Sequence, residues 1–561
     1  MNSKISHKAV VHLYVREAWR RMSRRAALAR LNLTRHAVRV PERLIVAPTD
    51  LRSIDPFVAE EILRGRIHLA GRTLDTEGKS PFSLELPSQT FAARLHGFGW
   101  LRHMRADKND RSCATARSIV NEWIAVHGRR VEGIAWQADI AAQRLIAWLS
   151  HSPVVLQGTD GGFYRRFMKS LIFHIRVLRR IAATAPDGEV RFRVRIALAM
   201  ASVAVPSRHS VMRAAGQALD REIDRQILPD GGHISRNPRA ALDLLLDLLP
   251  LRQTYVNLGH DVPQRLIPGI DRMYPALRFF RHQDGDLALF NGATSTLATE
   301  LMSVLRYDET GGQPFKALPH AEYQRLAAGQ TALIVDTGKP ASVDLSRRAH
   351  AGCLSFEMSA GKHRFIVNSG SPKFAGNRYV QMARATAAHS TVTLNDTSSA
   401  SFSRSDFLGP VMVAGVQSVT VERSEREDGR DVVLASHDGY LASFGLLHER
   451  ELTLNATGTI VTGRDRMVVP EGRSPAKGEH RASARFHIHP SIVLMQKEID
   501  SVVMTAPDGE TWMFSSPGND VLIGEDVFFA DASGVRASEL IEVSFSVAEK
   551  PEIRWFLSRR R

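Results

Sequence analysis

A run of side chains at the start of a predicted helix could bind an anionic ligand and act on it. Residues 228–239, Leu-Pro-Asp-Gly-Gly-His-Ile-Ser-Arg-Asn-Pro-Arg, place His233, Arg236 and Arg239 around a glycine-rich turn. Guanidinium groups bind carboxylates in a bidentate manner, and an imidazole can accept a proton near neutral pH. We therefore predict His233 as a catalytic base and Arg236, Asn237 and Arg239 as substrate-binding residues. The alternatives are a solvated basic loop and, for Asn237, a helix N-cap before a proline.

A second set of candidates lies further along the chain. Arg348 and Arg384 could each neutralise a carboxylate, and we predict Arg348 as a catalytic residue and Arg384 as a substrate-binding residue. His350 and His389 offer imidazole nitrogens, which are common zinc ligands, so this pair is a candidate Zn²⁺ site. The alternative is that the two histidines are hydrogen-bonded to each other across adjacent strands.

Two further patterns carry groups that could do chemistry. The sequence from His437 to Tyr440, His-Asp-Gly-Tyr, predicts a turn, and we take Tyr440 as a third catalytic candidate. The alternative is a tyrosine that packs within the turn. Asp243 and Asp247 share one face of a predicted helix and could form the acid pair of a hydrolase. We disfavour that role because carboxylates one helical turn apart rarely flank a scissile bond at the needed separation.

The residues that carry the first cluster lie in a region of helical periodicity, from about 91 to 282. Apolar residues recur there at helical spacing, and Pro, Gly and Asp separate the segments. We predict the last two segments to be broken or kinked, because Pro250 and Pro275 fall inside them. No repeat of fixed length appears, so the pattern favours a helical toroid or bundle. The predicted helices are 91–105, 113–127, 138–150, 164–184, 191–205, 210–226, 239–258 and 262–280.

After about residue 330 the pattern changes to short strands. Alternating polar and apolar residues, punctuated by Gly, Asn, Asp and Pro, predict antiparallel sheets stacked as a sandwich. Residues 465–478 are expected to form a long exposed loop. The predicted organisation is a basic leader or helix over 1–40, a toroid domain over 41–325 and a β-sandwich domain over 326–561.

The amino-acid composition limits the classes of molecule that the protein is expected to bind. Lys and Arg exceed Asp and Glu by 15 in 561 residues, which favours an anionic partner such as an acidic polysaccharide. We expect no nucleic acid as partner, because zinc-finger spacing, ribonucleoprotein motifs and a convincing helix-turn-helix are missing from the sequence. The sequence contains no run of about 18 consecutive apolar residues and therefore predicts no membrane span. Two distant cysteines predict no disulfide framework.

The first 40 residues carry much of the positive charge. Ten Lys and Arg stand there against one acid, Glu17, and the apolar residues form no h-region of a secretory signal. The segment could be an amphipathic helix that contacts a membrane surface or an anionic polymer. The alternative is a solvated helix that packs on its own domain.

The chain resembles the heparinase II/III-like family over most of residues 56–561. The resemblance is strongest at 136–151, 228–294 and 349–396. It implies an incomplete α/α toroid followed by an antiparallel β-sandwich. It also implies a carbon–oxygen lyase that cleaves uronate-containing glycans by β-elimination in the bacterial periplasm or cell envelope. The absence of a recognisable signal peptide leaves the cytoplasm as the alternative.

Several residues that do the chemistry in that family differ here. The family's Ser-Pro-x-Tyr-His pattern falls on residues 237–241, so the catalytic Tyr and the His beside it become Ala240 and Ala241. Its His-x-His-x-Asp pattern falls on residues 348–352, so Arg348 replaces the catalytic His while His350 keeps the metal-type His. The later metal Asp becomes Asn368, and the third His is His389. We therefore expect a lyase-like protein with a rearranged catalytic set; the alternative is a non-catalytic protein that binds an acidic glycan or assists envelope polysaccharide assembly.

Overall fold

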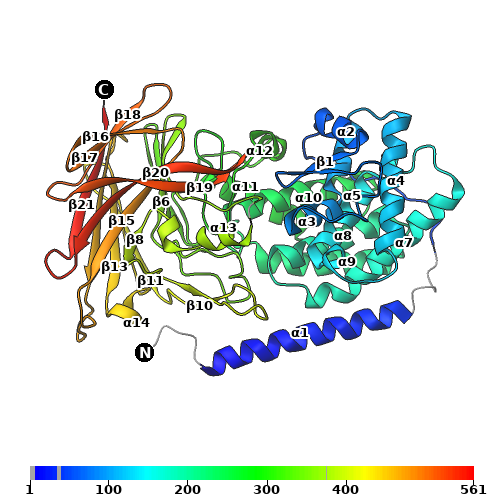
Figure 1. Ribbon diagram of the computed structural model, residues 1–561, viewed down its shortest axis with the longest axis horizontal. Helices are drawn as coiled ribbons and strands as arrows, with labels where there is room; N and C mark the ends of the chain where they lie inside the picture. Colours follow the sequence, from blue (N-terminus) through cyan, green and yellow to red (C-terminus); the bar gives the residue numbers. More distant parts are fainter. Residues whose placement is uncertain (1–6, 34–39, 375, 561) are drawn as a thin grey trace.

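The structure is a computed structural model and describes residues 7–33, 40–374 and 376–560. A helical half and a β half lie side by side, and the N-terminal helix α1 runs along the outside of both (Figure 1). Each half has its own large apolar core. The chain is therefore an α+β protein whose two halves meet along one junction.

The helical half surrounds a core rich in Trp, Phe and Leu. Side chains cap several of its helices: the oxygens of Asn109, Asp160 and Asn237 accept hydrogen bonds from backbone N–H groups in the first turns of α4, α7 and α10. The helices are α1 (His7–Leu33), α2 (Pro56–Leu63), α3 (Gln89–Gly97), α4 (Asp110–His127), α5 (Ala138–Ser150), α6 (Ser152–Val155), α7 (Gly161–Ile181), α8 (Glu189–Ala204), α9 (His209–Gln226), α10 (Pro238–Asn257), α11 (Leu266–Phe280) and α12 (Ala298–Leu305), with 3₁₀ turns at Gly99–Arg105, Ile134–Trp136 and Ala182–Thr184. A hairpin of β1 (Arg66–Leu69) and β2 (Arg72–Asp75) follows α2.

The β half consists of two large antiparallel sheets. One has the strand order β11-β12-β13-β14-β21-β18-β17-β16, and the other β19-β20-β15-β7-β6-β5-β4-β3, with β8 also paired to β15. The strands are β3 (Ala317–Leu318), β4 (Tyr323–Ala328), β5 (Thr331–Asp336), β6 (Phe356–Ala360), β7 (His363–Val367), β8 (Val392–Leu394), β9 (Ser401–Phe402), β10 (Met412–Ala414), β11 (Val419–Glu425), β12 (Asp431–His437), β13 (Leu447–Leu454), β14 (Ile460–Val468), β15 (Arg481–Ile488), β16 (Val493–Glu498), β17 (Ser501–Thr505), β18 (Thr511–Ser515), β19 (Val521–Asp531), β20 (Gly534–Ser546) and β21 (Glu552–Arg560). Two short helices, α13 (Asn377–Met382) and α14 (Leu441–Phe444), and a 3₁₀ turn at Thr386–Ala388 interrupt them.

Two predicted features of the elements are corrected. Of the break or kink that Pro250 and Pro275 predict, the break is absent, because helices α10 and α11 continue through these prolines. Pro250 lies in a stretch of α10 that is buried on most sides, where tertiary packing offsets the lost hydrogen bond. The loop expected over 465–478 begins later, because β14 extends to Val468 and pairs with both β13 and β21.

The two halves are joined by buried polar contacts. Arg236, just before α10, donates hydrogen bonds to the backbone oxygens of Ala321 (2.9 Å) and Lys339 (3.1 Å) and pairs with Asp336 at the end of β5. Tyr323 on β4 donates its hydroxyl to the backbone oxygen of Arg236 at 2.7 Å. Because Arg236 is 7% exposed, these contacts replace the water that its charge would otherwise require.

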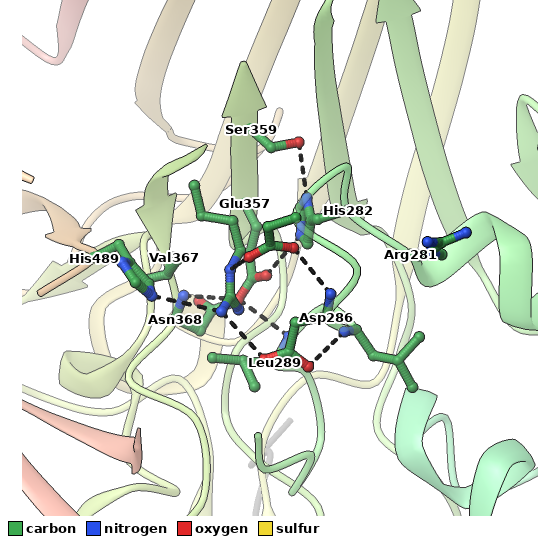
Figure 2. Close-up of polar contacts among 12 residues, drawn as sticks. Arg281, His282, Asp286, Leu289, Glu357, Ser359, Val367, Asn368 and His489 are labelled. Atoms are coloured by element: carbon green, nitrogen blue, oxygen red, sulfur yellow. Dashed lines mark hydrogen bonds and ion pairs between the residues drawn. The ribbon is translucent and has the colours of Figure 1, made fainter. Parts of the chain in front are cut away.

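A second buried cluster lies where the chain leaves α11 and enters the sheet (Figure 2). The Glu357 carboxylate on β6 accepts hydrogen bonds from His282 Nε2 (3.0 Å), from the backbone N–H of Leu289 (3.1 Å) and from that of Asn368 (2.9 Å). His282 Nδ1 lies 2.9 Å from the Ser359 hydroxyl. The segment after α11 is thereby fixed against the sheet.

Helix α1 packs on the body through polar contacts. Arg24 donates to the backbone oxygen of Trp136 at 3.0 Å, and Arg16 pairs with Asp344 of the β half. Tyr14 stacks on Phe407, with ring centroids 5.7 Å apart. None of the helices that the structure describes is both long and apolar enough to cross a membrane.

Candidate functional site: a basic cleft between the two halves

A cleft of about 960 Å³ lies between the helical half and the β half. Helices α3, α5, α8, α10 and α12 and the β1–β2 hairpin contribute side chains from one half, and the segments around residues 347–350 and 371–384 contribute from the other. Ten of its lining residues are cationic and five are acidic. The cations are Arg52, Arg72, Arg94, Arg102, Arg193, Arg239, Arg347, Arg348, Lys373 and Arg384; the acids are Asp50, Asp139, Asp243, Asp247 and Glu300.

Ion pairs along α10 neutralise most of the acids. Arg239 Nε lies 3.0 Å from an Asp243 oxygen, and its Nη2 lies 2.5 Å from Glu300. Against the opposing effect of burial, these carboxylates raise the pKa of Arg239, and Arg239 in turn lowers the pKa of Asp243. Arg52 pairs with Asp247 at 2.8 Å. Both aspartates on α10 are therefore paired with arginines, which does not suit an acid–base pair of a hydrolase.

Other cations of the cleft have no carboxylate within 4 Å in the part of the chain that the structure describes. Arg94 lies over the Phe374 ring, with its guanidinium carbon 4.8 Å from the centroid. Arg102 donates only to the backbone oxygens of Ser53 and Gly99. Burial lowers the pKa of Arg94, of Arg102 and of Lys373, as expected when positive charge is desolvated without a counter-ion. An anion in the cleft would relieve this cost.

The structure brings Arg348, Arg384 and Arg239 of the predicted set to this cleft. The Arg348 side chain is 75% exposed and meets only Glu189, at 3.5 Å, so it can turn toward a ligand. Arg384 is buried, donates to the backbone oxygens of Ala349 (2.9 Å) and Ser346 (2.7 Å), and lies over Phe402. Burial lowers its pKa to about 10. Arg384 therefore fixes the segment that carries Arg348 and leaves little of its own guanidinium for a ligand.

His350 borders the cleft and contacts His389, as the alternative to the zinc prediction describes. His350 Nδ1 lies 3.1 Å from His389 Nε2, and His389 Nδ1 donates to the backbone oxygen of Ala385 at 2.8 Å. Burial, followed by the neighbouring His389, lowers the pKa of His350 well below its ordinary value, and burial lowers that of His389 to about 4. Both imidazoles are neutral near pH 7.

The residues present do not fit a zinc site. Asn368, at the position of the expected third ligand, accepts from the backbone N–H of Ser390 (3.0 Å) and donates to Glu357 (3.4 Å). Among the described residues no three His, Cys, Asp or Glu side chains converge as metal ligands. A pair of neutral histidines bonded to each other lacks the anionic ligand and the third donor that zinc sites use.

The structure does not bring four other predicted residues to the cleft lining. His233 is 3% exposed, with Nε2 bonded to Gln226 and Nδ1 accepting from Ser235; burial lowers its pKa to about 4. Asn237 caps α10, accepting from the backbone N–H of Arg239 at 2.9 Å. Arg236 belongs to the junction described above. Tyr440 lies in the core of the β half and donates to the backbone oxygen of Val392 at 2.8 Å, and burial raises its pKa.

The tyrosine that the family resemblance implies for β-elimination has no counterpart in the described lining of the cleft. No tyrosine lines it within the described residues, and Ala240 and Ala241 are buried. Of its histidines, His103 accepts the backbone N–H of Asp55, and burial lowers its pKa to about 4. What the arrangement can do is bind negative charge over a long, positively charged surface.

Arg52, Arg94, Arg102, Lys373 and Phe374 also line the cleft but were not predicted from the sequence. The three arginines come from the helical half and Lys373 and Phe374 from the other half, so the two groups meet only because the halves face each other. The single signal that could have found Arg94 and Arg102 is their place in a region rich in basic residues and in helical periodicity.

A helical toroid joined to a β-sandwich across a basic cleft is the architecture of polysaccharide lyase-like proteins. Residues 310–556 match the family model described as heparinase II/III-like, C-terminal. The chain is 30% identical over 536 residues to FtsZ-localized protein C of Caulobacter vibrioides (strain NA1000 / CB15N), an alignment that covers 92% of this chain and 91% of that protein.

Solved structures agree with this assignment of the fold. Heparinase III superposes with a TM-score of 0.72 at 13% identity, covering 94% of this chain and 88% of that one. A mutant of the heparan sulfate lyase HepC from Pedobacter heparinus gives 0.60 at 15% identity, with 96% and 88% covered. The chain belongs to the heparinase II/III-like family.

Proposed function

We propose that the protein binds an acidic polysaccharide, one that contains uronates, in the cleft without cleaving it. The observation that supports this most is the composition of the cleft: ten cations face five acids, four of which pair with arginines, and no tyrosine is present among the described lining residues. The competing proposal is that the protein cleaves the polysaccharide by β-elimination, because the solved structures that share its fold include lyases.

Two measurements on the full chain separate these outcomes. Binding to fluorescent heparan sulfate and polygalacturonate is followed by anisotropy, and cleavage by the ultraviolet absorbance of the unsaturated product. We expect saturable binding that weakens as salt rises, because exposed charges are screened, and no absorbance change. A rise in absorbance would establish the lyase instead, and absence of binding to both polymers would refute the proposal.

A charge reversal at the rim locates the bound polymer. Arg348→Glu and Lys373→Glu should each weaken binding by about tenfold, because each replaces an attraction for the anionic polymer by a repulsion. Arg554→Glu is the matched control: its side chain is 66% exposed on β21, outside the cleft. Equal losses in all three variants would mean that the polymer binds the whole basic surface.

We also propose that α1 holds the protein on an anionic membrane surface. Val11, Val15, Trp19 and Met22 recur at helical spacing and are 56–66% exposed, so they form an apolar face that the body leaves uncovered. Helix α1 carries seven Lys and Arg against Glu17, and Arg25 near this face is exposed. An apolar face bordered by cations is complementary to anionic headgroups above acyl chains.

Vesicle sedimentation tests the membrane contact. The protein should sediment with vesicles that contain phosphatidylglycerol and not with pure phosphatidylcholine, and Trp19 fluorescence should shift to the blue. Val15→Glu should abolish both effects, whereas Val493→Glu, at a site 67% exposed on β16, should not. Sedimentation that persists in Val15→Glu would contradict the contact.

The name of the Caulobacter relative leads to a proposal about location. We propose that this chain, like FtsZ-localized protein C, gathers where FtsZ gathers in the bacterial cell. A fluorescent fusion imaged together with labelled FtsZ is the test. Uniform fluorescence along the cell would argue against it.

A further inference from the structure

A second hollow of about 820 Å³ shares no lining residue with the cleft. The end of α11, the segment before β3, the β4–β5 hairpin and the β11–β12 hairpin surround it. Its lining contains five cations and two acids. The cations are Arg278, Arg281, Lys316, Arg325 and Arg423, and the acids are Glu425 and Asp431.

Three of these cations already have carboxylate partners. Arg278 pairs with Asp308, Lys316 with Glu425, and Arg423 with Asp431 at 2.5 Å. Those pairs leave Arg281 and Arg325 as the two charges without a carboxylate within 4 Å among the described residues.

Arg325 on β4 is 7% exposed and is only partly accounted for by the fold. Its Nη1 donates to the backbone oxygens of Phe279 (2.8 Å) and Arg281 (3.3 Å), which satisfies carbonyls at the C-terminus of α11. Its Nε is buried without a partner, and burial lowers its pKa to about 10. The C-terminal carbonyls of α11 therefore offset part of the positive charge of Arg325. Its Nε–H group is left without an acceptor among the described residues.

Arg281 lines the same hollow and likewise has no carboxylate partner among the described residues. Its Nε is buried and unpartnered. Figure 2 shows its side chain apart from the His282–Glu357 cluster, with no dashed line reaching it. The backbone contact to Arg325 keeps the two arginines together at one wall of the hollow.

We propose that this second hollow binds an oxyanion, such as a phosphate or sulfate group, between Arg281 and Arg325. Two arginines that line one hollow, each with an unpartnered Nε and neither with a carboxylate partner in the part of the chain that the structure describes, match the several acceptor oxygens of such an anion. Phe315, 48% exposed at the rim, offers an apolar face to a sugar ring that carries the anion. The site is independent of the polymer-binding cleft.

Calorimetric titration of the full chain with inorganic phosphate tests the site. We expect saturable binding, and Arg281→Gln should raise the dissociation constant at least about fivefold, the effect of one lost charge-assisted hydrogen bond. Arg554→Gln, on β21 and outside both hollows, should leave phosphate binding unchanged. No saturable binding, an unchanged constant in Arg281→Gln, or a loss in Arg554→Gln would each overturn the proposal.

The source of the anion is resolved by a second titrant. If the ligand is carried on a sugar, glucose 6-phosphate should bind more tightly than phosphate, and Phe315→Ala should remove the difference; equal constants support a free anion in the same site. Circular dichroism checks that Arg281→Gln is folded. Polymer affinity should not change in that variant, so a failure here is distinguishable from a failure of the proposed cleft.

Discussion

His233 and His389 are buried imidazoles whose ring nitrogens are both used inside the fold. Burial holds the pKa of each near 4, whereas an unfolded histidine titrates near 6.5. The unfolded chain therefore binds these protons first as the pH falls. The contribution of these two histidines to the free energy of unfolding is fully present above about pH 6.5. It is lost progressively as the pH falls to about 4.

Replacing one of these groups should make the pH dependence shallower. In His233→Gln, the free energy of unfolding should fall less between pH 7 and pH 4.5 than in the unchanged chain, by about 2 kcal/mol. Urea unfolding at the two pH values measures the difference. His12→Gln on α1, an exposed site, is the control, and identical slopes in all three chains would contradict the burial argument.

Residue types predicted which side chains could do chemistry but not which ones a ligand can reach. The family resemblance placed His350 and His389 together correctly, because both lie in segments with recognisable patterns. It could not show that His233 and Tyr440 are buried, since burial depends on packing between segments distant in sequence. Nor could it find Arg94 and Lys373, whose proximity arises only from the closure of the two halves.

At the scale of elements, periodicity located the helices well and their ends less well. Residues 138–150 form α5 as predicted, whereas the segment expected over 91–105 divides at Phe98, which has a left-handed φ of 57°. Local sequence does not reveal such a turn when the residue is not glycine. Pro250 predicts a break or kink, but α10 continues through it, because the packing of this buried helix offsets the cost of the proline.

Asn237 at the N-terminus of α10 provides a prediction at this scale, because its role as a helix N-cap can be separated from a role in binding the polymer. Asn237→Ala should lower the free energy of unfolding by about 1 kcal/mol, the usual cost of a lost N-cap, and leave polymer affinity unchanged. Asn237→Asp retains the capping oxygen and should restore most of the stability. Thermal unfolding together with anisotropy tests both points; weaker polymer binding in both variants at unchanged stability would instead make Asn237 a ligand-binding residue.

At the scale of the whole molecule, the junction between the two halves fixes the shape of the cleft. Arg236 reaches from the helical half into the β half, and the Glu357 cluster fixes the segment after α11. Both junction contacts are buried and polar, which makes the relative placement of the halves specific: a shifted arrangement would leave charges unpaired. A cleft built from both halves needs that fixed placement to present its cations together.

Removing the Arg236 side chain should therefore loosen the whole molecule. Arg236→Met leaves Asp336, which is 3% exposed, without its cationic partner, and we expect a loss of about 3–5 kcal/mol in the free energy of unfolding. Arg348→Met removes the same groups from a side chain that is 75% exposed and should change stability by no more than about 0.5 kcal/mol. Urea unfolding measures both. Because the cleft depends on the junction, limited proteolysis within residues 337–347 should also become faster in Arg236→Met only. If the two variants prove equally stable and equally resistant, Arg236 does not hold the halves together, and the cleft must owe its shape to the Glu357 cluster instead.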